Sequence, residues 1–245
     1  MSNNRFEGKT AIVTGAAGGI GEVYARRLAA EGANVVVADL NDEAGQKVAA
    51  DIGGTYVHTD VADPDSAQAL ADATIAKYGQ IDYLVNNAAI YGTMKLDFLI
   101  TVPWDYYKKF MSVNFDGALN VTRAVYGKMK PGSAIVNQSS TAAWLYSGFY
   151  GVAKAGVNSL TQQLAVELGG SGIRINAIAP GPTDTEATRT ATPGDMVADM
   201  VDKLPLKRMG TPDDMAAMLA FLLSDEASWI TGQIFNVDGG QVFRS

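Results

Sequence analysis

Short runs of apolar, β-branched residues alternate along this chain with longer segments of helical spacing. The runs lack polar alternation, which is typical of parallel strands that are covered on both faces of a sheet. They comprise residues 10–13, 34–37, 55–57, 83–85, 134–137, 174–178 and 234–237. Because parallel strands need helical crossovers, the alternation predicts a Rossmann-type, doubly wound α/β sheet of about seven strands with helices on both faces.

Helix start signals agree with this pattern. Asp63-Pro64 and Thr211-Pro212 each place a capping side chain before a proline, as is favoured at a helix N-terminus. The 245 residues show no linker or repeat, and their number fits one α/β domain. We therefore expect a single domain over residues 1–245, with ligands bound at the carboxyl ends of its strands.

Composition argues against several classes of site and partner. The chain has no cysteine and one histidine, so disulfides, thiolate sites and two-histidine metal centres are unavailable, and we expect no metal. His58 lacks an orienting neighbour, and we interpret it as a strand-end residue. The net charge of −7 disfavours nucleic acid. Residues 1–9 lack an apolar leader core and no run is long enough to span a membrane, so we expect a cytoplasmic protein.

A glycine-rich turn, residues 14–21 (TGAAGGIG), joins the first expected strand to a helix. Glycines let backbone N–H groups approach a pyrophosphate, and the positive end of the helix then faces the phosphates. Such a turn is weak evidence alone, but its place in a βαβ unit predicts a dinucleotide site. We assign Gly15, Gly19, Ile20 and Gly21 to the cofactor.

Asp39 ends the second expected strand, where a carboxylate can accept hydrogen bonds from the adenosine ribose. Alternatively, Asp39 caps the helix that begins near Asn41. A carboxylate ~4 Å from a 2′-phosphate would cost about 4 kcal/mol per charge at an effective dielectric of about 20. Neither Leu40 nor Asn41 compensates with a positive charge, so the sequence favours NAD(H) over NADP(H).

Tyr150 and Lys154 stand four residues apart, so their side chains share one face of a helix. Leucines at every fourth position continue an apolar stripe and predict a helix from about Tyr150 to Leu168. The spacing is common by chance. It gains weight from its place after an apolar strand and the pair Ser139-Ser140.

Together with further motifs, these features resemble the short-chain dehydrogenase/reductase family over essentially the whole chain. The motifs are the turn 14–21, Asp60-Val61, Asn86-Asn87-Ala88-Ala89, Val113-Asn114, Ser139-Ser140, Tyr150 with Lys154, Pro180-Gly181 with Thr185, 230–233 and 237–240. The resemblance implies an oxidoreductase that interconverts a secondary alcohol and a ketone by hydride transfer with nicotinamide.

The resemblance also implies four catalytic residues. Tyr150 would be the general acid/base, and Ser140 would hydrogen-bond the substrate oxygen. Lys154 would hold the nicotinamide ribose and, with the positive charge of oxidised nicotinamide, favour the Tyr150 phenolate. Asn114 would hold a water in a proton relay. Alternatives remain, because Ser139 could replace Ser140 and Asn114 could instead bridge backbone groups.

Cofactor contacts follow from the same resemblance. Asp60 and Val61 would flank the adenine, Asn86 and Ala88 would adjoin its ribose, and Tyr150 would also contact the cofactor. The carboxamide would be fixed by the segment Pro180, Gly181, Thr183 and Thr185.

The chain departs from the family pattern twice. Residues 140–150 form a shorter loop than usual, which puts the placement of Ser140 and the pocket wall in doubt. Ala89 stands where glycine is customary, and its methyl group is tolerable if φ stays negative.

Bulky side chains on the expected loops suggest an apolar, cyclic or aromatic substrate, unless several of them pack in the core or an interface. They are Tyr91, Met94, Trp144, Leu145, Tyr146 and Phe149. Residues 186–204 resemble a substrate lid, and family members commonly form homotetramers through the helices that contain Asn114 and Tyr150. An NADPH-dependent ketone reductase and a catalytically inactive dinucleotide-binding regulator are the alternatives.

Overall fold

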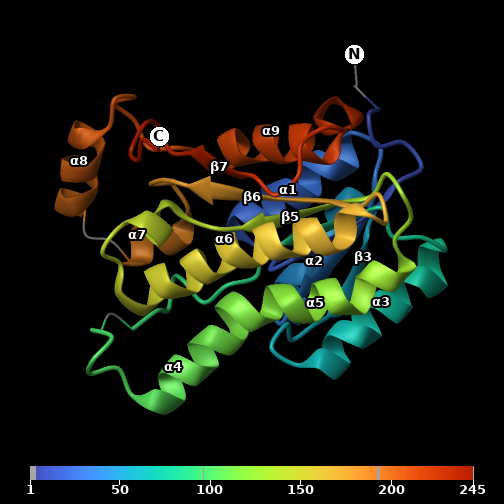
Figure 1. The fold of residues 1–245 in the computed structure, drawn as a ribbon, viewed down its shortest axis with the longest axis horizontal. Helices are drawn as coiled ribbons and strands as arrows, with labels where there is room; N and C mark the ends of the chain where they lie inside the picture. The colour runs from blue at the N-terminus through green and yellow to red at the C-terminus, as the bar shows by residue number, and fades with distance from the viewer. Residues whose placement is uncertain (1–3, 96, 192–193, 245) are drawn as a thin grey trace.

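A seven-stranded parallel sheet in the order β3-β2-β1-β4-β5-β6-β7 forms the centre of the protein, as the sequence predicts. The computed structural model describes residues 4–95, 97–191 and 194–244 (Figure 1). All seven expected apolar runs are strands, most of them extended at the carboxyl end by one or two residues. The strands are β1 (Thr10–Thr14), β2 (Asn34–Asp39), β3 (Thr55–His58), β4 (Tyr83–Asn86), β5 (Ala134–Gln138), β6 (Arg174–Pro180) and β7 (Ile234–Val237).

Helices cover both faces of the sheet. One face carries α1 (Gly19–Ala30), α2 (Asp42–Ile52) and α9 (Pro212–Leu223). The other face carries α3 (Pro64–Tyr78), α5 (Gly117–Val125) and α6 (Gly148–Gly169). The remaining elements are α4 (Trp104–Met111), the π turn η1 (Ser112–Asp116), the 3₁₀ turns η2 (Tyr126–Lys128), η3 (Thr141–Trp144) and η4 (Asp225–Ala227), α7 (Glu186–Ala191) and α8 (Gly194–Lys203).

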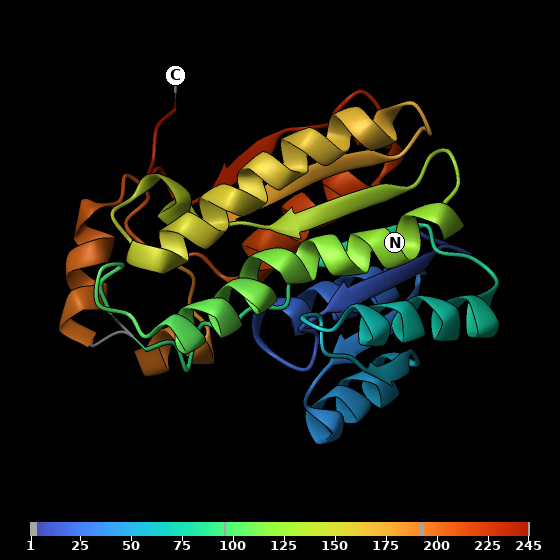
Figure 2. The ribbon, with the colours of Figure 1, turned by 60° about the horizontal axis from the view of Figure 1, so that its bottom comes forward.

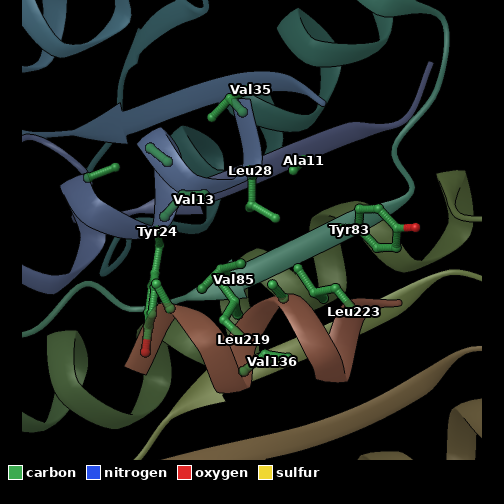
Figure 3. Packing of buried hydrophobic residues seen from close by; sticks show 14 of the residues in the cluster. Ala11, Val13, Tyr24, Leu28, Val35, Tyr83, Val85, Val136, Leu219 and Leu223 are labelled. Carbon is green, nitrogen blue, oxygen red and sulfur yellow. The ribbon is translucent and has the colours of Figure 1, made fainter. Parts of the chain in front are cut away.

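Two hydrophobic cores separate along the strands because successive side chains point to opposite faces of the sheet. In β1, Val13 packs towards α1 and α9, whereas Ile12 packs towards α3 and α5. Figure 3 shows the first core, in which Tyr24 of α1 and Leu219 of α9 approach the strands. These cores fix the strand ends from which the functional loops emerge.

The predicted helix starts at Asp63 and Thr211 are confirmed. Asp63 accepts a hydrogen bond from the backbone of Asp65, and Thr211 forms a reciprocal capping box with Asp214. His58 ends β3, as expected, and is exposed. The expectation that it lacks an orienting neighbour is wrong, since its Nδ1 lies 2.7 Å from a carboxylate oxygen of Asp42. Across the described ranges, every helix is too short or too polar to cross a membrane.

The order of strands reverses beside β1, since β2 lies on one side of it and β4 on the other. Such a reversal opens a crevice at the carboxyl ends of the strands. The helices α7 and α8 lie at that edge, and the amino-terminal end of α6 points to it (Figures 1 and 2). The fold therefore directs attention to this edge as the site.

Candidate active site

A cavity of about 1840 Å³ runs along the carboxyl edge of the sheet, from the glycine turn to α8. Most of the residues predicted from the sequence line it, and Gly21, Asn86 and Asn114 do not. Those that do are Gly15, Gly19, Ile20, Asp39, Asp60, Val61, Ala88, Ser140, Tyr150, Lys154, Pro180, Gly181, Thr183 and Thr185. The topology thus brings together residues that lie up to 170 positions apart in the sequence, from Gly15 to Thr185.

The glycine turn is held by close backbone packing. A Cβ atom on Gly21 would lie 2.1 Å from the carbonyl oxygen of Gly15, so no other residue fits there without a shift. Asn87 donates from Nδ2 to the carbonyl oxygens of Thr14 and Gly15, each at 3.0 Å. No side chain caps α1 at Gly18, so its first N–H groups remain available for an anion. This geometry fits a dinucleotide pyrophosphate.

Asp39 ties this turn to the end of β2. Its two carboxylate oxygens accept hydrogen bonds from the backbone N–H groups of Ala17, at 2.9 Å, and Asn41, at 3.0 Å. The N-cap of α2 is Asn41, which accepts from Ala44, and so Asp39 does not take the capping role that was its alternative. In the described part of the chain, no Lys or Arg lines this end of the cavity.

The adenine end differs in one residue from the expectation. Asp60 accepts a hydrogen bond from the backbone of Ala62, and Asp60, Val61 and Ala88 line the cavity. Asn86, by contrast, is buried, and its Nδ2 donates to Asn137 Oδ1 at 2.9 Å. Because that side chain is used inside the sheet, Ala88 and the neighbouring Asn87 are the residues placed to contact a ribose.

Tyr150 and Lys154 lie on the first two turns of α6, whose bounds match the predicted helix. Lys154 is buried, its Nζ lies 5.8 Å from the centroid of the Tyr150 ring, and it donates to the carbonyl oxygen of Gln138 at 2.9 Å. Burial without a neighbouring carboxylate lowers the pKa of Lys154 to about 8.

The two serines differ in what their hydroxyl groups bind. Ser139 is buried and donates to Asn158 Oδ1 at 2.5 Å. Ser140 caps the turn η3 by accepting from the backbone of Ala142, and its hydroxyl lies close enough to Tyr150 to lower the pKa of the phenol. The shortened loop therefore keeps Ser140 beside the phenol, while Asn158 fixes Ser139.

Burial raises the pKa of Tyr150 above its ordinary value, and the hydrogen bond from Ser140 opposes that rise. This direction differs from the lowered pKa that the sequence led us to expect for the working enzyme. Burial likewise lowers the pKa of Lys154, so this lysine is mostly neutral at the alkaline pH where the buried phenol ionises and does not offset the loss of water around it.

Asn114 lies in the π turn between α4 and α5, a local widening of the helix that is frequent at functional sites. Its Nδ2 donates to the carbonyl oxygen of Phe110 at 3.1 Å, which is the backbone bridge considered above. Its Oδ1 is buried and has no hydrogen-bond partner in the part of the chain that the structure describes. With Lys154 and Asn86, Asn114 lines a second cavity of about 10 Å³, close to the space for one water. The structural and relay roles are thus compatible.

The end of β6 and the segment after it approach the cavity through Pro180 and Gly181. A Cβ atom on Gly181 would lie 2.7 Å from Asp238, and Thr183 donates to the carbonyl oxygen of Gly181 at 3.0 Å. Thr185 caps α7 by accepting from the backbone of Thr188. The side chain of Thr185 is therefore partly engaged within the protein.

The substrate end of the cavity is built by loops. Of the six bulky side chains expected there, five line it, and Trp144 instead stacks under the guanidinium of Arg244 at 4.4 Å. Phe149 also belongs to the hydrophobic core, since it is buried and packs edge-on against Phe110. Ala89 keeps a negative φ, so its methyl group causes no strain. The expected lid contains α7 and α8, with residues 192–193 outside the described part.

Some residues at the site were absent from the sequence assignment. Asn87 holds the glycine turn, Asn158 holds Ser139, and Gln138 supplies the carbonyl that binds Lys154. Asn87 belongs to a quoted motif and could have been assigned. Asn158 follows Lys154 by one helical turn, which is a spacing that could have suggested a shared face.

Comparison with known proteins places this geometry in a family. The family profile described as "Enoyl-(Acyl carrier protein) reductase" matches residues 15–241. The chain is 67% identical over 247 residues to an uncharacterized oxidoreductase of Mycobacterium tuberculosis, covering 98% of this chain and 100% of that protein. It is 40% identical over 245 residues to the cis-4-hydroxycyclohexanecarboxylate dehydrogenase of Sinomonas cyclohexanicum, covering 96% and 97%.

Solved structures agree. A 7α-hydroxysteroid dehydrogenase complexed with NADH and 7-oxo glycochenodeoxycholic acid has a TM-score of 0.92 at 34% identity, covering 99% of this chain and 98% of that one. A short-chain dehydrogenase from Burkholderia cenocepacia in complex with NADP has a TM-score of 0.89 at 32% identity, covering 97% and 99%. The chain belongs to the short-chain dehydrogenase/reductase family of nucleotide-binding oxidoreductases.

Proposed function

We propose that this protein is an NAD(H)-dependent oxidoreductase that interconverts a secondary alcohol and a ketone on an apolar, cyclic or aromatic skeleton. The observation that carries this proposal is the cluster of Tyr150, Ser140 and Lys154 at the edge of one cavity with the glycine turn. In that cavity a proton donor and a dinucleotide can reach the same carbon–oxygen bond.

In the proposed mechanism, Tyr150 exchanges a proton with the substrate oxygen, and Ser140 hydrogen-bonds that oxygen. The contact between Ser140 and the phenol supports a shared position for one oxygen atom. A donor aimed at a developing oxyanion typically accelerates such a reaction by about 10²–10³. Bound nicotinamide supplies or accepts the hydride, and its oxidised form brings a positive charge that favours the phenolate.

Lys154 and Asn114 would resupply the proton. The ammonium of Lys154 has three N–H donors and uses one of them on Gln138 in this structure. Asn114, whose Oδ1 has no partner among the described residues, and Lys154 line the same small cavity, where one water could join them. We propose this arrangement as the path by which Tyr150 regains or releases its proton.

Asp39 carries the proposal for NAD over NADP. It lines the cavity near the turn, and two N–H groups fix its carboxylate, so it cannot easily withdraw from a 2′-phosphate. The solved relatives include complexes with NADH and with NADP, so the family leaves the choice open. The choice for this chain rests on its own carboxylate and on the missing cation at Leu40 and Asn41.

The proposed substrate class follows from the side chains that line the substrate end of the cavity, which is built by loops. Tyr91 lies 5.6 Å from Tyr150 between ring centroids, and Met94, Leu145 and Phe149 add apolar surface. Two relatives are named for cyclic alcohols or ketones, a cyclohexane derivative and a steroid. These observations support a cyclic substrate.

We also propose a homotetramer. Val152 and Val166 on α6 and Tyr126 beside α5 are exposed apolar side chains on the two helices through which the family commonly associates. Light scattering tests this proposal, and a monomer at working concentration would contradict it.

The function is tested by assaying a panel of secondary alcohols and ketones through NADH absorbance, with both cofactors. We expect cyclic substrates to be converted faster than linear ones, and NAD(H) to be used in preference. Conversion of linear substrates alone would contradict the proposed class. Binding of NADH without turnover of any substrate would favour the regulator.

A further inference from the structure

Two lysines lie in the substrate half of the cavity, which is otherwise lined mainly by apolar and aromatic side chains. Lys95 and Lys109 both line it, in a protein whose net charge is −7. Among the described residues, the ion pairs within 4.0 Å include neither of them. An unpaired positive pair in an acidic protein attracts an anion to that end of the cavity.

Tyr106 of α4 organises these lysines. Its hydroxyl accepts a hydrogen bond from the backbone N–H of Lys95 at 2.9 Å, and the Nζ of Lys95 lies 5.4 Å from its ring centroid. Lys109 follows Tyr106 by three residues, so both lie on one face of α4. The Lys95 ammonium therefore lies at the Tyr106 ring, and Lys109 lines the same cavity from the next turn of α4.

A row of aromatic rings connects this ring to the catalytic tyrosine. The ring of Phe110 lies 6.2 Å from Tyr106 and 6.3 Å from Tyr150 between centroids. The lysines thus lie near the far end of a short row of rings, of which Tyr150 and Tyr106 line the cavity and Phe110 is buried behind them. A compact cyclic molecule could reach Tyr150 with one end and the lysines with the other.

Two carboxylates also line this half of the cavity. Asp97 is engaged in its own loop, where one oxygen accepts from the backbone of Phe98 at 2.7 Å and from Thr101 Oγ1 at 2.5 Å. Glu186 lies in the first turn of α7. These two carboxylates balance the two lysines in formal charge. Among the described residues, however, neither carboxylate lies within 4.0 Å of a lysine ammonium, so Lys95 and Lys109 keep their ion-pairing capacity for a ligand.

We infer that the substrate carries a carboxylate at the end remote from the reacting carbon, and that Lys95 and Lys109 bind it. The inference rests on the proposed function and narrows its apolar substrate to a cyclic hydroxy or oxo acid. An anionic group could also come from the phosphates of a coenzyme A thioester. The short row of rings between Tyr150 and Lys95 favours the carboxylate, because pantetheine would carry the phosphates well beyond it.

The test compares matched ketones with the NADH-bound enzyme: 4-oxocyclohexanecarboxylate, its methyl ester, and acetoacetyl-coenzyme A. The variants are Lys95→Met, Lys109→Met and the double variant, which keep an unbranched stem. Lys108→Met is the matched control, because Lys108 adjoins Lys109 on α4 and does not line the cavity.

We expect KM for the carboxylate to rise about three- to tenfold in each single variant and more in the double, since partly exposed ion pairs contribute modestly. The ester should change less than about twofold, and kcat should stay near the wild-type value. Added salt should raise KM for the carboxylate only. Equal losses for ester and carboxylate, or a lysine-dependent preference for the thioester, would overturn the inference.

Cyclohexanecarboxylate separates this inference from the proposed function, because it carries the carboxylate but has no ketone group to reduce. Calorimetry with the NADH-bound protein should show binding that weakens in the double variant and persists in Lys108→Met. If this binding is seen but no ketone is reduced, the proposed function fails and the anion site stands. If ketones are reduced while cyclohexanecarboxylate binds the double variant and the wild type equally, the anion site fails alone.

Discussion

The two halves of the cavity are built by different means. In the cofactor half, backbone hydrogen bonds and close packing set the geometry, as at Asp39, Gly21 and Asn87. In the substrate half, long loops and short helices carry side chains that face solvent. Ile100 is 93% exposed and Tyr146 is fully exposed. The first half is fixed by the sheet, whereas the second depends on each loop.

This difference shows which part of the fold can change in sequence, and so in function, while the rest is kept. A residue that fixes the glycine turn cannot change without moving a strand end or a helix. A residue in the loop between β4 and α4, or between η3 and α6, can change while the sheet stays intact. Tyr150 lies between the two halves, so substitutions there report on both cofactor binding and substrate conversion.

The largest expected effect comes from a substitution that removes the proton-transfer group and leaves the packing of both halves of the cavity unchanged. Tyr150→Phe deletes one hydroxyl and keeps the ring contacts with Tyr91 and Phe110. Turnover should fall by roughly 10²–10⁴, the usual span for a positioned proton donor. NADH binding, followed by quenching of protein fluorescence, should remain near the wild-type value. A variant that keeps most of the wild-type turnover would show that the chemistry lies elsewhere.

The second effect separates neighbouring serines. Ser140→Ala should lower kcat by about 10²–10³, because it removes the donor beside Tyr150. Ser139→Ala should instead lower stability by about 1–3 kcal/mol, since it leaves the buried Oδ1 of Asn158 without its donor. Steady-state kinetics and urea unfolding of both variants provide the comparison. A larger kinetic loss in Ser139→Ala would assign the substrate contact to Ser139.

The third effect concerns the burial of Lys154, which lies where the two halves of the cavity meet, and is measured as a change in stability with pH. The folded protein lowers the pKa of Lys154 to about 8 from 10.5, so the unfolded chain binds more protons between these values. Stability of the cofactor-free protein should therefore rise with pH over this window, relative to Lys154→Met, by at most about 3 kcal/mol. Urea unfolding of both proteins at pH 7.5 and 10 measures it. A constant difference would mean that Lys154 keeps its ordinary pKa.

The sequence predicts these regions unequally for physical reasons. All seven strands and the helix bearing Tyr150 follow from apolar patterns, because a buried parallel sheet imposes them. The π turn at Asn114 and the inward direction of Asn86 leave no such pattern, since both depend on contacts between distant segments. The pKa shift of Tyr150 likewise depends on three-dimensional burial. The pair Lys95 and Lys109 looks like ordinary surface charge until folding places both on the wall of one cavity.

The smallest expected effect concerns cofactor choice and is the sharpest test of the backbone-fixed half. Wild-type kcat/KM should favour NAD over NADP by at least about tenfold, or ~1.4 kcal/mol. Asp39→Ala with Leu40→Arg should shift the preference towards NADP. Because the Asp39 carboxylate also accepts from Ala17 and Asn41, removing it could loosen the turn as well.

Asp39→Asn separates the two contributions. The amide keeps an acceptor for the Ala17 N–H group and loses the charge that repels a 2′-phosphate. If charge determines the choice, this variant should accept NADP better while binding NAD with only a few-fold loss from the ribose contact. If support of the turn determines it, Asp39→Asn should keep the wild-type preference, and Asp39→Ala should weaken both cofactors alike. Equal use of the two cofactors by the wild type would refute the electrostatic argument for Asp39.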